Sequence, residues 1–255
     1  MITDRKEKTY NSAFVLGVRI DKVTLQEAVD ICKKLIKSNT GHYVVTPNPE
    51  IIVAARKNSQ FKEILNGSDL SIPDGIGIVW LSKIFGNSTP ERVSGIDLLE
   101  SLVQVAAENG LGIFLLGGRE GVAEKASKVL KNRYPNLKIV GTFAGDGERS
   151  GDREVLKKIG QDHIDILAVA YGPGKQERWI KRNLEKINVK LAISVGGSLD
   201  FISGEKRRSP KWVQNIGLEW LFRLVNEPSR WKRQLALPVF VSLFFIEKLS
   251  KGKFR

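Results

Sequence analysis

The chain has 255 residues, 42% of them hydrophobic and 27% charged, which is a typical composition for a globular protein. One cysteine, Cys32, excludes an internal disulfide, and two histidines exclude a histidine-rich metal site. The net charge of +13 is uneven, because residues 201–255 hold 12 Lys/Arg against 4 Asp/Glu, and such a basic end predicts an anionic partner: nucleic acid, a phosphorylated substrate or an anionic membrane surface.

The N-terminal residues 1–10 are polar and lack the apolar stretch of a signal peptide. No run of the chain reaches the roughly 18 apolar residues that a bilayer-spanning helix needs. We therefore expect a cytoplasmic protein.

Short apolar runs alternate along the chain with segments of helical spacing. Thr24 and Glu27 have the spacing of a capping box, and the apolar residues after them predict a helix over 25–36. Ser94 is a predicted N-cap for a helix over 96–109, which should end at Gly110. Strands are predicted at 13–20, 43–45, 69–72, 112–118, 138–142, 165–170 and 191–195. Further helices are predicted near 50, 61–65, 76–85, 121–133, 153–159 and 175–187.

The strands after the first are mostly continuous apolar runs, as fully buried parallel strands should be. With the helices between them they predict an α/β fold, a doubly wound, Rossmann-like sheet of about six parallel strands. Right-handed crossovers would bring the loops after the strands to one edge of the sheet. That edge should gather Thr46 and Asn48, Asp74, Gly117 and Gly118, the loop at Gly145, the loop 172–176 and residues 196–200.

The composition changes after Ser203, which predicts two parts: a catalytic domain, 1–203, and a basic amphipathic C-terminal appendage, 204–255. The basic and aromatic stretch 230–233 suits a position at a membrane interface.

The appendage itself is predicted to be helical. Apolar residues between Trp212 and Leu224 predict a single amphipathic helix, which Glu227-Pro228 should end. The next run, 235–246, is strongly apolar and is expected to break at Pro238.

The tight turn Ser71–Gly77 joins a buried strand to a helix and carries Asp74. In open α/β sheets ligands bind at the carboxyl ends of the strands, so Asp74 is a candidate for the group that does chemistry. The alternative is that Asp74 only caps the following helix, because Asp is a favoured N-cap residue. The local pattern alone favours the cap.

Glycine loops at the strand ends suit phosphate binding, because bare backbone N–H groups and helix N-termini attract anions. The chain has no P-loop, HExxH, CxxC or DxD pattern, so a metal-bridged diphosphate has no obvious ligands. Arginines and helix dipoles are the expected means of neutralising a diphosphate. The glycines of 117–121 only weakly match a dinucleotide-binding pattern, and a plain strand-to-helix turn explains them equally well.

Seven motifs occur at consistent spacing along residues 12–247. They are Thr46-Pro47-Asn48-Pro49-Glu50, Pro73-Asp74-Gly75, Glu91-Arg92-Val93-Ser94-Gly95, Gly172-Pro173-Gly174-Lys175-Gln176-Glu177, Val195-Gly196-Gly197-Ser198-Leu199-Asp200, Leu218–Leu224 and Glu227–Arg233. In this order they resemble the motifs of the WecG/TagA/CpsF glycosyltransferases (glycosyltransferase family 26). The family's usual Pro-Lys-Gln-Glu appears here as Pro-Gly-Lys-Gln-Glu.

The resemblance implies an inverting, metal-independent transfer from a UDP-sugar to N-acetylglucosamine on undecaprenyl diphosphate, without a cofactor. In the teichoic-acid and enterobacterial-antigen branches the sugar moved is N-acetylmannosamine or its uronic acid. The acceptor implies a peripheral position on the inner face of the cell membrane. The family also suggests a homo-oligomer.

The same resemblance assigns roles to residues of this chain. Asp74 would be the general base that takes a proton from the acceptor hydroxyl. The other residues of the pocket would be Thr46, Asn48, Arg92 and Gln176. The UDP end would be held by Gly196, Gly197 and Asp200. Closure over the site and binding of the diphosphate would fall to Arg223, Arg230 and Arg233.

Each assignment has a simpler structural alternative. Thr46 and Asn48 would only shape a turn, Arg92 would pair with Glu91 or Glu100, and Gln176 would be a surface helix residue. Trp212 and Trp220 are expected to pack against neighbours rather than bind a sugar.

Two other functions compete with the glycosyltransferase. A nicotinamide-dependent oxidoreductase would use Gly117, Gly118 and Gly121 for a pyrophosphate and needs an acidic residue at the end of the next strand, but that strand ends in Val140-Gly141-Thr142. A nucleic-acid-binding protein would use the basic end, but the apolar run 235–246 favours lipid over a phosphodiester backbone. We therefore expect no nucleic-acid partner.

Overall fold

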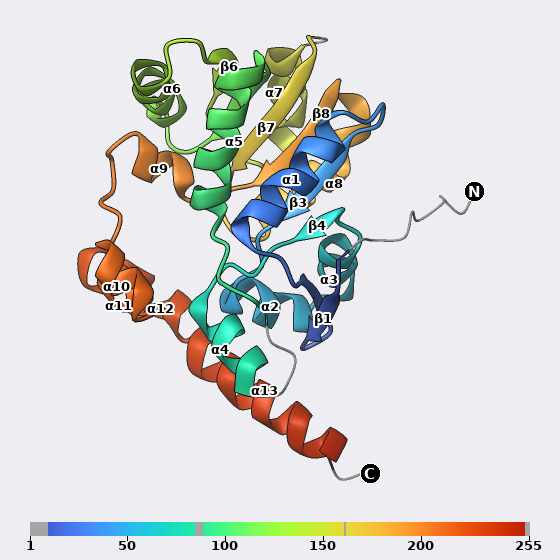
Figure 1. Cartoon of the computed structure of the whole chain (residues 1–255), viewed down its shortest axis with the longest axis vertical. Helices are drawn as coiled ribbons and strands as arrows, with labels where there is room; N and C mark the ends of the chain where they lie inside the picture. Colours follow the sequence, from blue (N-terminus) through green and yellow to red (C-terminus); the bar gives the residue numbers. More distant parts are fainter. Residues whose placement is uncertain (1–9, 85–88, 161, 253–255) are drawn as a thin grey trace.

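The computed structural model describes residues 10–84, 89–160 and 162–252 and contains the predicted six-stranded parallel sheet (Figure 1). The strand order is β4-β3-β8-β7-β5-β6. The strands are β3 (His42–Val45), β4 (Leu70–Ser71), β5 (Gly112–Gly117), β6 (Lys138–Phe143), β7 (Ile164–Ala170) and β8 (Val189–Ser194). The predicted doubly wound α/β fold is therefore confirmed.

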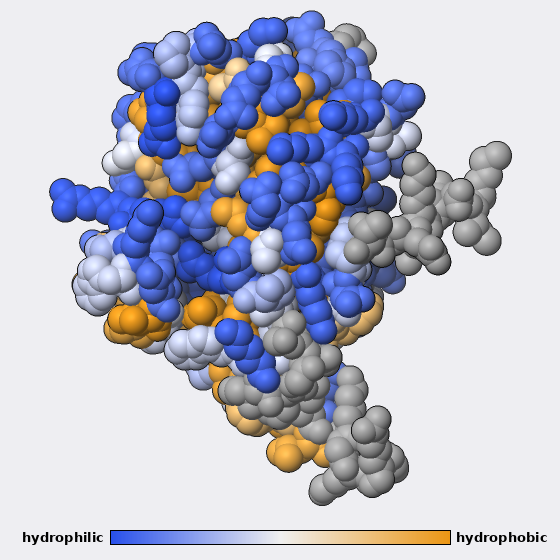
Figure 2. All heavy atoms as spheres, viewed as in Figure 1, coloured by the Kyte–Doolittle hydropathy of each residue, from blue (hydrophilic) through white to orange (hydrophobic). Residues whose placement is uncertain are grey.

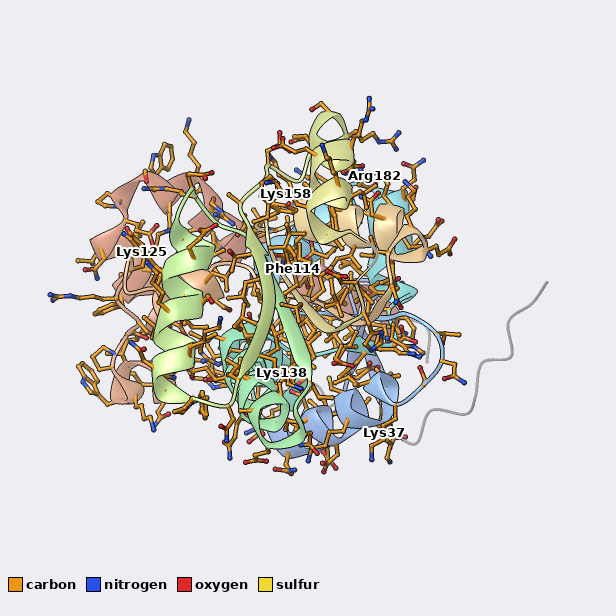
Figure 3. The ribbon with its side chains drawn as sticks, turned by 90° about the horizontal axis from the view of Figure 1, so that it is seen from above. Lys37, Phe114, Lys125, Lys138, Lys158 and Arg182 are labelled. Carbon is orange, nitrogen blue, oxygen red and sulfur yellow. The ribbon has the colours of Figure 1, made fainter. Side chains whose placement is uncertain are left out.

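Helices cover both faces of this sheet, and each face has its own apolar core. The first core contains residues of α1 (Leu25–Ile36), α5 (Gly95–Asn109), α6 (Val122–Arg133) and α9 (Ser198–Ile202). The second contains residues of α2 (Pro49–Arg56), α3 (Ser59–Asn66), α4 (Ile76–Ile84), α7 (Asp152–Ile159), α8 (Lys175–Asn183) and α13 (Ala236–Gly252). Figure 3 shows Lys125 of α6 on one side of the sheet and Lys158 and Arg182 on the other.

The predicted caps explain where several helices begin and end. Thr24 and Glu27 form the expected capping box of α1. Ser94 caps α5, and Gly110 ends it in the left-handed conformation with φ 68°, which glycine adopts at little cost. Short 3-10 turns cover Arg149–Gly151 and Leu184–Lys186.

The predicted first strand, 13–20, is instead an antiparallel hairpin of β1 (Ser12–Val15) and β2 (Val18–Asp21). Its two-residue turn holds Leu16 at φ 50° and Gly17 at φ 81°. Leucine is uncommon at a positive φ, so a leucine within an apolar run does not indicate a turn. For this reason the sequence predicted one continuous strand. The hairpin is a separate two-stranded sheet beside β4.

The appendage is helical, as expected, but its divisions differ from the prediction. The single amphipathic helix is two short ones, α10 (Lys211–Asn215) and α11 (Glu219–Asn226), separated at Gly217 with φ 78°. A 3-10 turn, η3 (Pro228–Arg230), and α12 (Trp231–Gln234) follow. Pro238 does not break the apolar run, because it lies in the first turn of α13, where proline is tolerated.

The appendage leaves the sheet after α9 and returns along α2, as Figure 1 shows. Phe240 and Phe244 of α13 are buried in the second core. Many other apolar side chains of the appendage remain at the surface, and Figure 2 shows apolar atoms exposed in this part of the molecule. Trp212 is 66% exposed and Trp220 39% exposed, so neither side chain is buried in one of the two cores. Within the described ranges, no helix has the length and apolar character to cross a bilayer.

Candidate functional site

A cavity of about 450 Å³ lies at the edge of the sheet where the parallel strands end. Its walls come from the loops after all six strands of the sheet, including the predicted glycine loops at Gly118 and Gly145, from the start of α5 and from the appendage. Of the predicted site residues, it is lined by Thr46, Asn48, Asp74, Gln176, Gly196, Gly197, Asp200, Arg223, Arg230 and Arg233. The remaining one, Arg92, lines an adjoining cavity of about 140 Å³ together with Asp74 and the three appendage arginines. The topology thus gathers the predicted residues in one region.

Asp74 lies between the two cavities on the loop after β4. Its backbone N–H donates to the Pro47 carbonyl at 3.0 Å, which ties this loop to the one after β3. The backbone N–H of Gly95, the first residue of α5, lowers the pKa of the Asp74 carboxyl and so favours its ionised form. Asp74 therefore interacts with the N-terminus of α5 and not with the helix that follows it in sequence, which was the alternative considered for it, and its side chain also faces the cavities.

The environment of Asp74 makes it a weaker acid than an ordinary aspartate. The pKa of Asp74 is raised to about 6. Burial and the Glu219 carboxylate raise it, and together they outweigh the opposing charges of Arg92 and Arg223. Above this pH the group is an anion in a partly desolvated cavity. Such a carboxylate can accept a proton near neutral pH.

Arg92 pairs with neither of the acidic residues that the sequence suggested. Its Nη1 donates to the Glu219 Oε2 at 2.7 Å, across 127 positions of sequence. Glu91 instead accepts from the Leu25 backbone N–H, and Glu100 pairs with Arg133. The Arg92 side chain is 14% exposed, so this ion pair is largely removed from water.

Each appendage arginine that lines the cavities has a carboxylate partner. Arg223 pairs with Glu219, Arg230 with Glu227 at 3.3 Å, and Arg233 with Glu50 at 2.8 Å. Burial, with the charges of Arg233 and Arg223 close by, lowers the pKa of Arg230. The arginines therefore form a crowded cationic cluster that a polyanionic ligand would stabilise.

Thr46 and Asn48 both have local structural partners. The Thr46 hydroxyl donates to the Ser194 carbonyl at 3.1 Å, which joins the ends of β3 and β8. The Asn48 Oδ1 accepts the Ile51 N–H at 2.9 Å and so caps α2. Both residues shape the loop, as the simpler alternative held, and both also line the larger cavity.

Gln176 is buried, so the alternative of a surface helix residue is wrong. Its Nε2 donates to the Glu177 Oε1 at 2.8 Å, and its Oε1 accepts the Gly196 backbone N–H at 2.9 Å. Glu177 is fully buried and also accepts the Gly174 N–H at 2.7 Å. These bonds fix the loop after β8 against the start of α8.

The Gly196–Asp200 segment forms the turn from β8 into α9. Gly196 has φ 56°, and a Cβ at this position would meet nothing within 4 Å, so its backbone borders open space. Asp200 faces Lys206, with the carboxylate and ammonium 3.5 Å apart. In the described part of the chain, no group of three or more His, Cys, Asp and Glu side chains could hold a metal ion.

Several residues that build the site were not predicted as functional. Glu50, Glu219 and Glu227 all lie inside the motifs quoted above, but their arginine partners are set by tertiary structure. Tyr171, which lines the larger cavity on the loop after β7, was likewise not singled out. The motifs contain acidic residues as well as the arginines. Matching each arginine of a motif with a carboxylate partner could have identified these acidic residues from the sequence.

The comparisons with known proteins agree with this geometry. Residues 13–254 match the model of the "Glycosyl transferase WecG/TagA/CpsF family". The chain is 34% identical over 222 residues to the N-acetylglucosaminyldiphosphoundecaprenol N-acetyl-beta-D-mannosaminyltransferase of Bacillus subtilis (strain 168), covering 87% of this chain and 86% of that protein. It is 31% identical over 242 residues to the protein of the same name from Staphylococcus aureus (strain MRSA252), covering 94% and 92%. The chain therefore belongs to the WecG/TagA/CpsF family and is a glycosyltransferase.

Proposed function

We propose that this protein transfers N-acetylmannosamine from a UDP-sugar to N-acetylglucosamine on undecaprenyl diphosphate, a step of cell-wall polysaccharide (teichoic acid) synthesis. The names of its relatives support the sugar and the acceptor. The observation that carries the proposal is Asp74, a carboxylate with a raised pKa that lies between two adjoining cavities beneath three arginines.

The reaction needs a base, and Asp74 is the proposed one. It accepts the proton of the acceptor hydroxyl as that oxygen attacks the anomeric carbon of the donor sugar. The new glycosidic C–O bond forms as the bond from the anomeric carbon to the diphosphate oxygen breaks, and the UDP leaves with that electron pair. Attack from the face opposite the leaving group inverts the anomeric configuration.

The leaving diphosphate gains negative charge, and the arginine cluster is suited to stabilise it. Arg223, Arg230 and Arg233 line both cavities around Asp74. Guanidinium groups bind phosphate oxygens in bidentate geometry, so they can take the place of a metal ion. Gly196, Gly197 and Asp200 would hold the nucleotide end, and the reaction would need no cofactor.

The appendage is proposed to act as a lid and as the membrane contact. Its exposed apolar side chains include Trp231 at 53%, Ile246 at 60% and Leu249 at 68%, beside basic residues that anionic lipids attract. We infer a peripheral position on the cytoplasmic face of the membrane, where the lipid-linked acceptor is accessible. The division at Ser203 and a homo-oligomer belong to the same proposal.

The test is a transfer assay with several UDP-sugars and a short-chain lipid-diphosphate N-acetylglucosamine acceptor, with products identified by mass. Asp74→Asn should lower kcat by about 10²–10⁴-fold with near-normal UDP-sugar binding, because only the proton acceptor is lost. Normal turnover by this variant would remove Asp74 as the base. The wild-type rate should persist in excess chelator, and loss of activity restored by Mg²⁺ or Mn²⁺ would contradict the metal-independent reaction.

A further inference from the structure

Glu219 occupies a central position between the appendage and the sheet edge. It is the first residue of α11, and its side chain is only 12% exposed. One carboxylate oxygen accepts from Arg92, in the loop before α5, and the other pairs with Arg223 on the next turn of α11. Glu219 thus bridges a body arginine and an appendage arginine.

The same two arginines are the cations that act on Asp74. Both oppose the effect of burial on the pKa of Asp74, whereas the charge of Glu219 raises it. Although burial opposes ionisation of Glu219 as well, Arg223 and Arg92 lower its pKa, so Glu219 remains a carboxylate near neutral pH. All four side chains line the cavity of about 140 Å³, where they form a cluster of two carboxylates and two guanidinium groups.

Removal of the Glu219 charge would change this balance in one direction. Arg223 would then lose its carboxylate partner, and Arg92 would keep only the Asp97 carboxylate of α5 at 3.9 Å, so both guanidinium groups would favour the ionised form of Asp74 more strongly. A strongly paired carboxylate is a poor proton acceptor, because accepting a proton would break its ion pairs.

We propose that Glu219 is a positioning residue for the reaction, which occupies Arg92 and Arg223 and so leaves the Asp74 carboxylate available to accept a proton. The inference rests on the proposed function of Asp74 as the base. According to this proposal, a residue of the appendage helix α11 influences the protonation of Asp74 at the edge of the sheet. The base is then a stronger proton acceptor when Glu219 is in place.

Other charged groups near Asp74 come from several elements. Arg230 of η3, Arg233 of α12 and Glu50 of α2 line the same adjoining cavity. Arg233 and Glu50 pair with each other, and Arg230 pairs with Glu227. In each of these pairs the carboxylate compensates the charge of its arginine. Glu219 differs, because it forms an ion pair with Arg92 and its charge also raises the pKa of Asp74.

The experiment is a titration of the full-length protein and of Glu219→Gln. The ¹³C carboxyl resonance of Asp74, identified by its loss in Asp74→Asn, is followed with pH, and the pH profile of kcat/KM is measured in parallel. Glutamine keeps the size of the side chain and a hydrogen-bond acceptor for Arg92 but removes the charge. The Asp74 pKa should fall by about one unit, and the acid limb of kcat/KM should move to lower pH by the same amount.

Two variants control this result. Glu219→Asp keeps the charge and should leave the Asp74 titration close to wild type. If Glu219→Gln does not fold, Glu219→Ala takes its place as the uncharged variant, with the same expected fall of the Asp74 pKa, and an unmoved pKa in that protein would overturn the proposal. Glu227→Gln removes a carboxylate of the same appendage whose partners are Arg230 and Lys206, and it should not move the Asp74 titration.

An unchanged Asp74 pKa in a folded Glu219→Gln protein would overturn the proposal, as would an equal shift in Glu227→Gln. Hydrogen exchange at α11 should be unchanged in Glu219→Gln, and faster exchange there would assign the shift to loss of docking instead. If Glu219→Gln lowers the Asp74 pKa but leaves the acid limb of kcat/KM unmoved, Glu219 does act on the charge of Asp74. That result would overturn the assignment of Asp74 as the base.

Discussion

The sheet domain and the appendage are held in place by different forces. α5 of the sheet domain has eight buried residues, whereas α11 and α12 of the appendage have none. Burial of apolar surface stabilises the domain without regard to charge or ligand. α11 and α12, in the middle of the appendage, are instead held to the domain by contacts of individual side chains.

Those contacts are mostly ionic. Glu219 pairs with Arg92 of the body, and Arg233 pairs with Glu50 at the start of α2. The apolar anchors are Phe240 and Phe244, both on α13. The side chains of the Arg233–Glu50 pair are 38% and 31% exposed, and ion pairs at such sites stabilise little and weaken with salt. The middle of the appendage is therefore the part whose position a bound anion can influence most. The site therefore has two different walls. The rigid wall is the sheet domain with its buried core, and the adjustable wall is the middle of the appendage, α11 to α12.

The largest effect is expected from removal of the adjustable wall. A chain that ends at Ser203 should keep its sheet and unfold cooperatively, because the core on the α1 and α5 face is intact. It should lose transfer activity by more than about 10³-fold, because three arginines of the proposed diphosphate site are absent. Circular dichroism, the transfer assay and co-sedimentation with anionic liposomes provide the measurements.

The full-length protein is the control for this truncation. Liposome binding should disappear with residues 204–255, and unchanged binding would locate the membrane contact elsewhere. A truncated chain without a cooperative thermal transition would show that α13 belongs to the fold of the domain, through Phe240 in the second core.

A smaller effect is expected from a single arginine. Arg230→Ala should lower kcat by about 10²–10³-fold, because it removes one donor that meets developing charge on the leaving group. Arg230→Lys should recover only part of this loss, since an ammonium lacks the bidentate geometry.

Arg207→Ala is the matched control for Arg230, because Arg207 is a basic, exposed residue of the appendage that lines neither of the two cavities around Asp74. It should leave kcat near wild type. Equal losses in the two variants would indicate an effect of net charge rather than of a diphosphate site.

The smallest expected effect concerns the rigid wall and is a gain of stability. Burial raises the folded-state pKa of Asp74 from its ordinary 3.8 to about 6, so this group disfavours folding once it is ionised. Its contribution therefore falls as the pH rises from about 4 to about 6 and stays unfavourable above that range. Asp74→Asn should raise Tm at pH 7.5, and the difference should shrink towards pH 4. A lower Tm at pH 7.5 would contradict this assignment.

Local signals predicted the sheet domain well. Thr24, Ser94 and Gly110 mark helix ends by their own chemistry, and the buried strands are continuous apolar runs. The hairpin was missed because Leu16 is an unusual residue for a turn. The strand order could not be predicted, because pairing such as that of β3 with β8 joins segments about 150 residues apart.

The appendage was harder to predict, although Gly217 and Pro238 were visible in the sequence. Each has two meanings, since a glycine can sit within a helix or end it, and a proline can break a helix or begin one. The candidate residues that line the cavities came from motifs, but the bonds of Gln176 to Gly196 and of Arg92 to Glu219 exist only in the folded chain.

The ion pairs between the sheet domain and the appendage should affect which substitutions related sequences can accept. Arg92 with Glu219 and Arg233 with Glu50 join positions 127 and 183 residues apart. Loss of one member leaves its partner's charge without compensation in a partly desolvated site, and a second substitution at the other position restores the balance. Evolutionary change at these sites is therefore expected in pairs, and statistical covariation between distant columns of related sequences would record the contact between the appendage and the sheet domain.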